Sequence, residues 1–349
     1  MLRGGLDHGE IVAGNQRDTS TVNMEFRAPS AHNVLAKFQD PDWTASGEQR
    51  AAVGLAHLET LWINTGTLCN IACINCYIES SPTNDRLVYI TAAEVGALLD
   101  EIADLKLNTR EIGFTGGEPF MNPYFIEMLT DALRRGFDVL VLTNAMQPMQ
   151  RPRIFAKLAE LAETYGEKLT IRVSLDHYTQ VLHESERGEK TWGKAIDGLN
   201  LLAGLKSVLA IAGRICWNET DSVSRAGFAD LIAAHNWPID PRDTARLLLL
   251  PEMDGKDDVP EITTACWDVL GKKPDQMMCA TSRMVVKRKG DKQPTIVPCT
   301  LLPYEPAFDM GASLAQSLKA DDGMFRDGAV KLCHSHCAKF CVLGGGSCS

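Results

Sequence analysis

Three cysteines in one short segment are the residues of this sequence whose type and spacing most clearly indicate chemistry. Cys69, Cys73 and Cys76 form a C-x3-C-x2-C pattern, and the next cysteine along the chain is Cys216. Thiolates bind zinc or iron–sulfur clusters, and both kinds of site ordinarily take four protein ligands. The missing fourth ligand leaves two interpretations: a zinc ion completed by a distant His or Cys, or a [4Fe–4S] cluster with one iron open to an external ligand.

The composition narrows the class of protein. The 349 residues are 45% hydrophobic and 23% charged, which is typical of a soluble globular chain. The net charge of −10 argues against a main role in binding nucleic acid, tRNA included. The sequence lacks an apolar run of membrane-spanning length and an apolar N-terminal signal, so we expect a cytoplasmic protein without a membrane partner. In a reducing compartment, eleven cysteines favour metal binding or reactivity over disulfides.

Apolar strands alternate with amphipathic helices from residue 58 onward. Near-continuous apolar strands of this kind indicate a parallel sheet covered by helices, either an open doubly wound sheet or a partial barrel. The polar and glycine motifs follow the strands directly, at the end where a barrel carries its site. We therefore predict an α/β fold with a partial (β/α)6 TIM-like barrel. Its strands are expected at residues 60–65, 111–117, 138–144, 169–176, 208–216 and 246–252.

Three regions are expected along the chain. Residues 1–57 show no sustained periodicity and are interpreted as an N-terminal extension, and residues 58–255 form the barrel. Residues 256–349 form a smaller cysteine-rich domain, with a β-hairpin over 283–299 that turns near Gly290. Cys216 and Cys266 are interpreted as small core residues.

The three-cysteine loop, placed directly after the first predicted strand, resembles that of the radical S-adenosylmethionine (radical SAM) superfamily, and the resemblance covers residues 58–255. It implies a [4Fe–4S] cluster on Cys69, Cys73 and Cys76, with SAM on the open iron. The implied activity is reductive cleavage of SAM to a 5′-deoxyadenosyl radical, which abstracts hydrogen from an unactivated C–H bond. The implied partners are a peptide or small-molecule substrate and an electron donor such as flavodoxin or ferredoxin.

The resemblance also implies residues that contact SAM. The segment "TGGEP" at 115–119 matches the glycine motif of the family. There Gly116 and Gly117 would let the backbone approach SAM, and Glu118 resembles the acceptor for its amino group. Asn144, at the end of the third strand, resembles a ribose or methionine contact, as do Ser174 and Asp176 at the end of the fourth.

Other positions depart from the family pattern or leave it open. Asn75 stands where the family usually has an aromatic residue, and Tyr77 after the third cysteine is predicted as a cofactor contact instead. Arg214, at the end of the fifth strand, either faces the SAM carboxylate or makes an outward salt bridge. Arg187 and Gly188 match an "RG" pair that recurs in members with extra clusters.

Six further cysteines near the C-terminus are predicted to hold at least one auxiliary [4Fe–4S] cluster. The hairpin between the first two resembles SPASM and twitch domains, although the later spacing, C-x3-C-x3-C-x6-C, departs from the SPASM pattern. Six cysteines are too few to ligate two clusters fully, so one twitch-like cluster is expected, with two incompletely ligated clusters as the alternative. His334 and His336 also keep a zinc site open. The predicted ligands are Cys279, Cys299, Cys333, Cys337, Cys341 and Cys348.

Two functions from different classes follow. The first is a radical SAM enzyme of oxidoreductase type, whose auxiliary cluster assists oxidation or bond formation. The second is a non-catalytic iron–sulfur redox sensor or scaffold. The "GGEP" and "SLD" motifs favour the enzyme, because a sensor needs no SAM pocket. No protein side chain is predicted as a catalytic residue.

Overall fold

The computed structural model describes residues 36–251 and 258–344. Six parallel strands follow one another across the sheet in chain order, so that each pairs with the strand before it. A doubly wound sheet would reverse this order at a switch point, so the sequential order is that of a partial barrel and confirms the predicted fold class. The strands are β2 (Thr60–Asn64), β3 (Glu111–Thr115), β4 (Asp138–Thr143), β5 (Leu169–Ser174), β6 (Val208–Ile215) and β7 (Leu247–Pro251).

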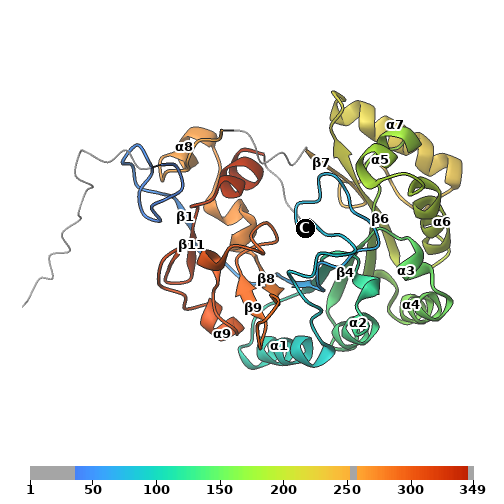
Figure 1. The fold of residues 1–349 in the computed structure, drawn as a ribbon, viewed down its shortest axis with the longest axis horizontal. Coiled ribbons are helices and arrows are strands. Elements are labelled where there is room, and N and C mark those ends of the chain that lie inside the picture. The colour runs from blue at the N-terminus through green and yellow to red at the C-terminus, as the bar shows by residue number, and fades with distance from the viewer. Residues whose placement is uncertain (1–35, 252–257, 345–349) are drawn as a thin grey trace, which may run out of the picture. The chain divides into compact units, whose positions relative to one another are not determined.

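Helices cover the outer face of this sheet (Figure 1). The first begins at a capping box, in which the Thr91 side chain accepts the Glu94 N–H and the Glu94 carboxylate accepts the Thr91 N–H. Two short helices were not expected from the sequence, α3 (Gln147–Gln150) and α5 (Gln180–Arg187). The longer helices are α1 (Ala92–Asp104), α2 (Phe125–Arg134), α4 (Pro152–Tyr165), α6 (Trp192–Leu202) and α7 (Asp221–His235).

The predicted C-terminal hairpin is present and continues the barrel sheet. It consists of β8 (Ser282–Val286) and β9 (Thr295–Val297), which pair antiparallel, and Gly290 lies between them at a φ of +95°. Strand β8 also pairs in parallel with β2, with Trp62 opposite Met284. The boundary expected near residue 255 is therefore not an edge of the sheet, and the division into domains stays a prediction.

The described part of the N-terminal extension joins the C-terminal region. Strand β1 (Ala52–Val53) pairs with β11 (Ala329–Lys331), and β10 (Phe325–Arg326) completes a three-stranded antiparallel sheet. The buried Arg50 forms an ion pair with Glu261, which also accepts the backbone N–H of Phe38 and Ala45. Residues 1–35 lie outside the described part. The C-terminal region also contains the short helices α8 (Cys266–Leu270) and α9 (Leu314–Ser317).

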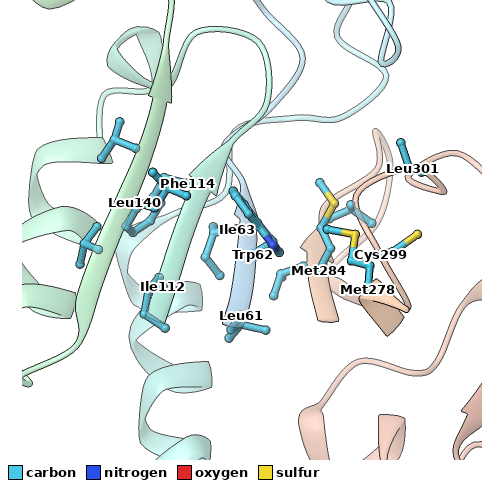
Figure 2. Packing of buried hydrophobic residues seen from close by; sticks show 14 of the residues in the cluster. Leu61, Trp62, Ile63, Ile112, Phe114, Leu140, Met278, Met284, Cys299 and Leu301 are labelled. Atoms are coloured by element: carbon cyan, nitrogen blue, oxygen red, sulfur yellow. The ribbon is translucent and has the colours of Figure 1, made fainter. Parts of the chain in front are cut away.

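The apolar core is centred on β2, in which every residue is buried. Figure 2 shows Trp62 with Phe114 on one side and Met284 with Cys299 on the other, so the indole joins the barrel to the hairpin. Its ring lies directly over Gly113, where a Cβ would be 2.4 Å from the indole, and only glycine fits. Cys216 and Cys266, interpreted as core residues, are both half-buried, and Cys266 packs against the core. Among the described helices, none combines the length and apolar character needed to cross a membrane.

Candidate functional site

A cavity of about 200 Å³ lies beside the ends of the parallel strands. All three cysteines of the C-x3-C-x2-C loop line it, which brings the predicted cluster ligands to one space. Seven of the eight predicted cofactor contacts line the same cavity. Six of them lie at the strand ends, because parallel strands end at one edge of a sheet, and Tyr77 lies in the cysteine loop. The seven contacts are Tyr77, Gly116, Gly117, Asn144, Ser174, Asp176 and Arg214.

The two glycines are required by the packing of one loop against another. The Gly117 N–H donates to the Gly66 carbonyl at 2.8 Å, so the glycine motif lies against the segment that leads into Cys69. A Cβ on Gly117 would lie 2.2 Å from the Leu68 carbonyl oxygen. A Cβ on Gly116 would lie 2.6 Å from the Gly66 carbonyl oxygen, and its φ of +130° also favours glycine. The predicted approach of SAM to this backbone stays a prediction.

Glu118 is the predicted contact that does not line the cavity. Its carboxylate is buried and accepts hydrogen bonds from the Thr143 hydroxyl at 2.8 Å and from the N–H groups of Asn144 at 2.9 Å and Phe120 at 3.3 Å. Burial raises the pKa of Glu118 to about 7, and these hydrogen bonds oppose the rise. The side chain therefore ties the end of β3 to the end of β4, and its predicted contact with the SAM amino group gains no support from this placement.

Asn144 is both a turn residue and a neighbour of the first cysteine. Its side-chain oxygen accepts the Met146 N–H at 3.0 Å, which makes an Asx turn after β4. Its amide nitrogen donates to Asn70 at 2.9 Å and lies 3.8 Å from the Cys69 sulfur. The amide is therefore held against the cysteine loop.

Asp176 is buried between two arginines. Nitrogens of Arg187 lie 2.7 and 3.1 Å from its oxygens, and Nε of Arg214 lies at 3.4 Å. Although burial opposes ionisation, Arg187 and Arg214 hold the pKa of Asp176 below its usual range. Arg214 therefore lines the cavity, and its ion pairs are with the buried Asp176 and Glu186 instead of an outward partner. The "RG" pair also acquires a structural role, because Gly188 ends α5 at a φ of +95°.

The polar Asn75, which replaces the usual aromatic residue, fastens the cysteine loop to α5. The Glu186 carboxylate accepts the Asn75 backbone N–H at 2.8 Å and its side-chain amide at 2.9 Å. Arg214 donates to the Asn75 carbonyl at 3.1 Å and lies 3.2 Å from the Glu186 carboxylate. The sequence did not predict this contact. Glu186 belongs to α5, which is so polar that its sequence shows no pattern of apolar residues at helical spacing.

The three thiols fit a cluster better than a single ion. Within residues 36–251 and 258–344, no three His, Cys, Asp or Glu side chains converge as ligands of one metal ion. A [4Fe–4S] cluster takes each cysteine on a different iron, so it requires no such convergence. Burial raises the pKa of Cys69 to about 12 and also raises that of Cys73. Because a metal deprotonates a coordinating thiol, the cluster would supply the charge that keeps these thiolates ionised.

Four C-terminal cysteines form a second group. Burial raises the pKa of Cys299 well above its usual value, and the nearby thiols of Cys337, Cys341 and Cys279 raise it further. Cys279 and Cys299 flank the hairpin, while Cys337 and Cys341 lie in one π-helical segment, Cys337–Leu343. Four neighbouring thiols are the complement that a [4Fe–4S] cluster takes.

Cys333 makes its hydrogen bond outside this group, although its thiol also raises the pKa of Cys337. The Cys333 thiol donates to the Asp40 carbonyl at 3.3 Å. Burial raises the pKa of Cys333, and Arg50 in the N-terminal segment opposes the rise. The ring of His334 accepts the His336 N–H at 3.1 Å, and Nδ1 of His336 lies 3.2 Å from the Leu301 carbonyl oxygen. Cys348, also predicted as a ligand, lies outside the described residues.

The sequence also missed two donors on the cavity wall. The indole nitrogen of Trp62 and the hydroxyl of Ser80 are buried, and neither has a hydrogen-bond partner among the described residues. Thr300 and Leu301, which follow Cys299, line the same cavity. A buried donor ordinarily has a partner, so each of these groups could donate to an acceptor bound in the cavity. The only sequence signal was the position of Trp62 in β2.

The chain is similar to known radical SAM proteins. Residues 63–214 match the family model of the radical SAM superfamily. The curated protein "antilisterial bacteriocin subtilosin biosynthesis protein AlbA" of Bacillus subtilis (strain 168) is 28% identical over 196 residues. That alignment covers 54% of this chain and 41% of AlbA, so the chain matches less than half of its curated relative.

Solved structures share the fold. Streptococcus suis SuiB bound to S-adenosylmethionine superposes with a TM-score of 0.55 at 13% identity, over 78% of this chain and 67% of SuiB. Native anSMEcpe with bound AdoMet and Cp18Cys peptide gives a TM-score of 0.52 at 14% identity, over 75% of this chain and 80% of that chain. At such identity the likeness concerns the fold alone.

The matched segment contains the cysteine loop, the glycine motif and the strand ends through Arg214. The cofactors expected from the sequence, SAM and [4Fe–4S] clusters, are confirmed as those of this superfamily. The C-terminal cysteines fit the auxiliary-cluster region that the resemblance implied. The family that the sequence predicted is therefore the one whose model matches residues 63–214, the radical SAM superfamily.

Proposed function

We propose that the protein is a radical SAM enzyme that modifies a peptide, abstracting hydrogen from an unactivated C–H bond with an auxiliary cluster assisting oxidation or bond formation. One observation carries this proposal: the cavity wall combines the C-x3-C-x2-C loop with Thr300 and Leu301, which directly follow Cys299. Both groups of cysteines therefore border or adjoin the space where a substrate would bind.

The names of similar proteins support a peptide over a small metabolite. AlbA is named for the biosynthesis of a bacteriocin, and SuiB has been solved with its precursor peptide SuiA. The orphan donors of Trp62 and Ser80 suit a peptide, because every residue of a peptide backbone offers a carbonyl acceptor.

The protein side chains and backbone would hold the cluster and SAM and line the space around them. Cys69, Cys73 and Cys76 would hold the cluster, and the glycine motif would bring backbone close to SAM. When bound, the reduced cluster and SAM supply hydrogen-atom abstraction by the 5′-deoxyadenosyl radical. Asp176 and its arginine partners fix the part of the cavity wall that adjoins the cysteine loop.

The first test is direct. The protein would be reconstituted with iron and sulfide without oxygen, reduced with dithionite and incubated with SAM. We expect 5′-deoxyadenosine from the wild type and none from a triple variant that combines Cys69→Ala, Cys73→Ala and Cys76→Ala. The triple variant should lose about four irons and keep those of the auxiliary cluster. Peptides encoded beside the gene, analysed by mass spectrometry for loss of two hydrogen atoms, test the substrate class.

A redox sensor or scaffold is the competing function. It predicts a wild-type protein that binds iron but yields no 5′-deoxyadenosine under any reductant. An electron donor such as flavodoxin or ferredoxin is part of the enzyme proposal, and replacing dithionite with reduced flavodoxin would test it.

A further inference from the structure

Arg283, in strand β8, is a fully buried arginine without an acidic partner in the described part of the chain. Its side chain is completely inaccessible to solvent. The buried Arg50 has Glu261 as its counter-ion, but no described carboxylate pairs with Arg283. An isolated buried charge is strongly unfavourable, so the guanidinium needs a source of negative charge.

The described surroundings of Arg283 supply some of the hydrogen-bond acceptors that its guanidinium requires, but no counter-ion. One terminal nitrogen, Nη1, donates to the carbonyls of Cys279 at 2.6 Å and Ser282 at 2.7 Å. The other, Nη2, donates to the Gly328 carbonyl at 3.4 Å. The third nitrogen, Nε, has no acceptor among the described residues. Carbonyl dipoles satisfy donors but carry no net charge, so a counter-ion and one acceptor are still missing.

Arg283 lies in the hairpin that Cys279 and Cys299 flank, and it is in direct contact with the backbone of Cys279. Cys279 and Cys299 are the groups that act electrostatically on the guanidinium. An arginine guanidinium is protonated at neutral pH, so Arg283 is a buried cation. The cation thus adjoins sulfur atoms that would be thiolates only in the presence of a metal.

We propose that Arg283 is the charge partner of the auxiliary cluster and raises its reduction potential. A [4Fe–4S] cluster with four thiolates has a net negative charge, which increases on reduction. A buried cation beside Cys279 and Cys299 therefore stabilises the reduced form more than the oxidised form, and Nε–H can donate to a sulfur. A higher potential favours electron acceptance, which is what an oxidative role of this cluster requires. Arg283 is a positioning residue, because it acts through the cluster.

This inference rests on the proposed auxiliary cluster, and the experiment separates the two. The Cys69, Cys73 and Cys76 triple variant is used as the background, because the auxiliary cluster is then the only one left. Arg283→Met removes the charge, and Arg283→Lys keeps it but loses the planar fork. Arg326→Met is the matched control, since Arg326 is exposed and pairs with Asp42. Each protein is reconstituted, assayed for iron and titrated spectroelectrochemically, with electron paramagnetic resonance of the reduced form.

We expect Arg283→Met to shift the midpoint potential to a more negative value, Arg283→Lys to shift it less, and Arg326→Met to leave it unchanged. A background protein without iron would refute the auxiliary cluster itself. Iron-loaded Arg283→Met with an unchanged potential would overturn only the role of Arg283. If Arg283→Met cannot retain a cluster, retention by Arg283→Lys supports the role of charge. Loss in both variants would assign Arg283 to the carbonyl hydrogen bonds and overturn the inference.

Discussion

Replacing Gly117 with alanine should displace the first cluster ligand. The new Cβ would lie 2.2 Å from the Leu68 carbonyl oxygen, 2.6 Å from the Leu68 carbonyl carbon and 2.9 Å from the Thr67 carbonyl oxygen. These are backbone atoms, so no side-chain rotation relieves the clash. Ordinary contact begins near 3.4 Å, and the closest pair must therefore separate by about 1.2 Å. Because Leu68 directly precedes Cys69, much of that movement falls on the cysteine loop.

The expected cost follows from the size of this movement. Overpacking of a well-packed site costs about 1–3 kcal/mol. If the strain is relieved by distorting the loop, this corresponds to SAM binding that is weaker by about 5- to 150-fold. A displacement of about 1 Å can also lower a catalytic rate about 100-fold. Gly117→Ala should therefore lose both SAM affinity and 5′-deoxyadenosine formation.

The assay compares Gly117→Ala with Gly193→Ala after anaerobic reconstitution. Gly193 lies in α6, no atom lies within 4 Å of the position that a Cβ would take there, and alanine favours a helix by up to about 1 kcal/mol. Iron content, the SAM dissociation constant by equilibrium dialysis and thermal unfolding are measured for both. Wild-type iron content and SAM affinity in Gly117→Ala would refute the reasoning, as would an equal loss in Gly193→Ala.

Three further predictions concern other parts of the molecule. Glu186→Ala removes two hydrogen bonds to Asn75, so the SAM dissociation constant should rise about tenfold or more by equilibrium dialysis, and unchanged affinity would count against the fastening role. Cys333→Ala should keep the full iron content, whereas Cys299→Ala should lose about four irons; equal losses would return Cys333 to the ligand set. Burial raises the pKa of Glu261, but hydrogen bonds from backbone N–H groups and an arginine outweigh burial and lower this pKa. The ionised Glu261 therefore stabilises the fold above about pH 4.3, and this stabilisation is lost as the pH falls through the pKa of Glu261 in the folded state. The unfolding temperature of the wild type should therefore fall more steeply below that pH than the unfolding temperature of Glu261→Gln. Parallel plots of unfolding temperature against pH would contradict this.

Local patterns were enough to predict the frame of the site. Buried parallel strands have an apolar signature, and their ends meet at one edge whatever the helices between them do. The positions of Cys69, Gly116, Asn144 and Ser174 on one cavity wall follow from that rule. The hairpin between Cys279 and Cys299 was likewise readable, because it is a local structure.

Tertiary structure alone decided which partner each polar group has. Glu118 bonds to the end of β4 instead of facing the cavity, Asn75 is fastened to Glu186, and the Cys333 thiol donates to Asp40. Each of these contacts joins segments far apart in the chain, and periodicity carries no information about such pairs. Types and spacing of residues thus determined the chemistry this protein can support. The pairing of buried charges, such as Arg50 with Glu261, depended on how distant segments pack, because a buried charge must find compensation wherever the fold supplies it.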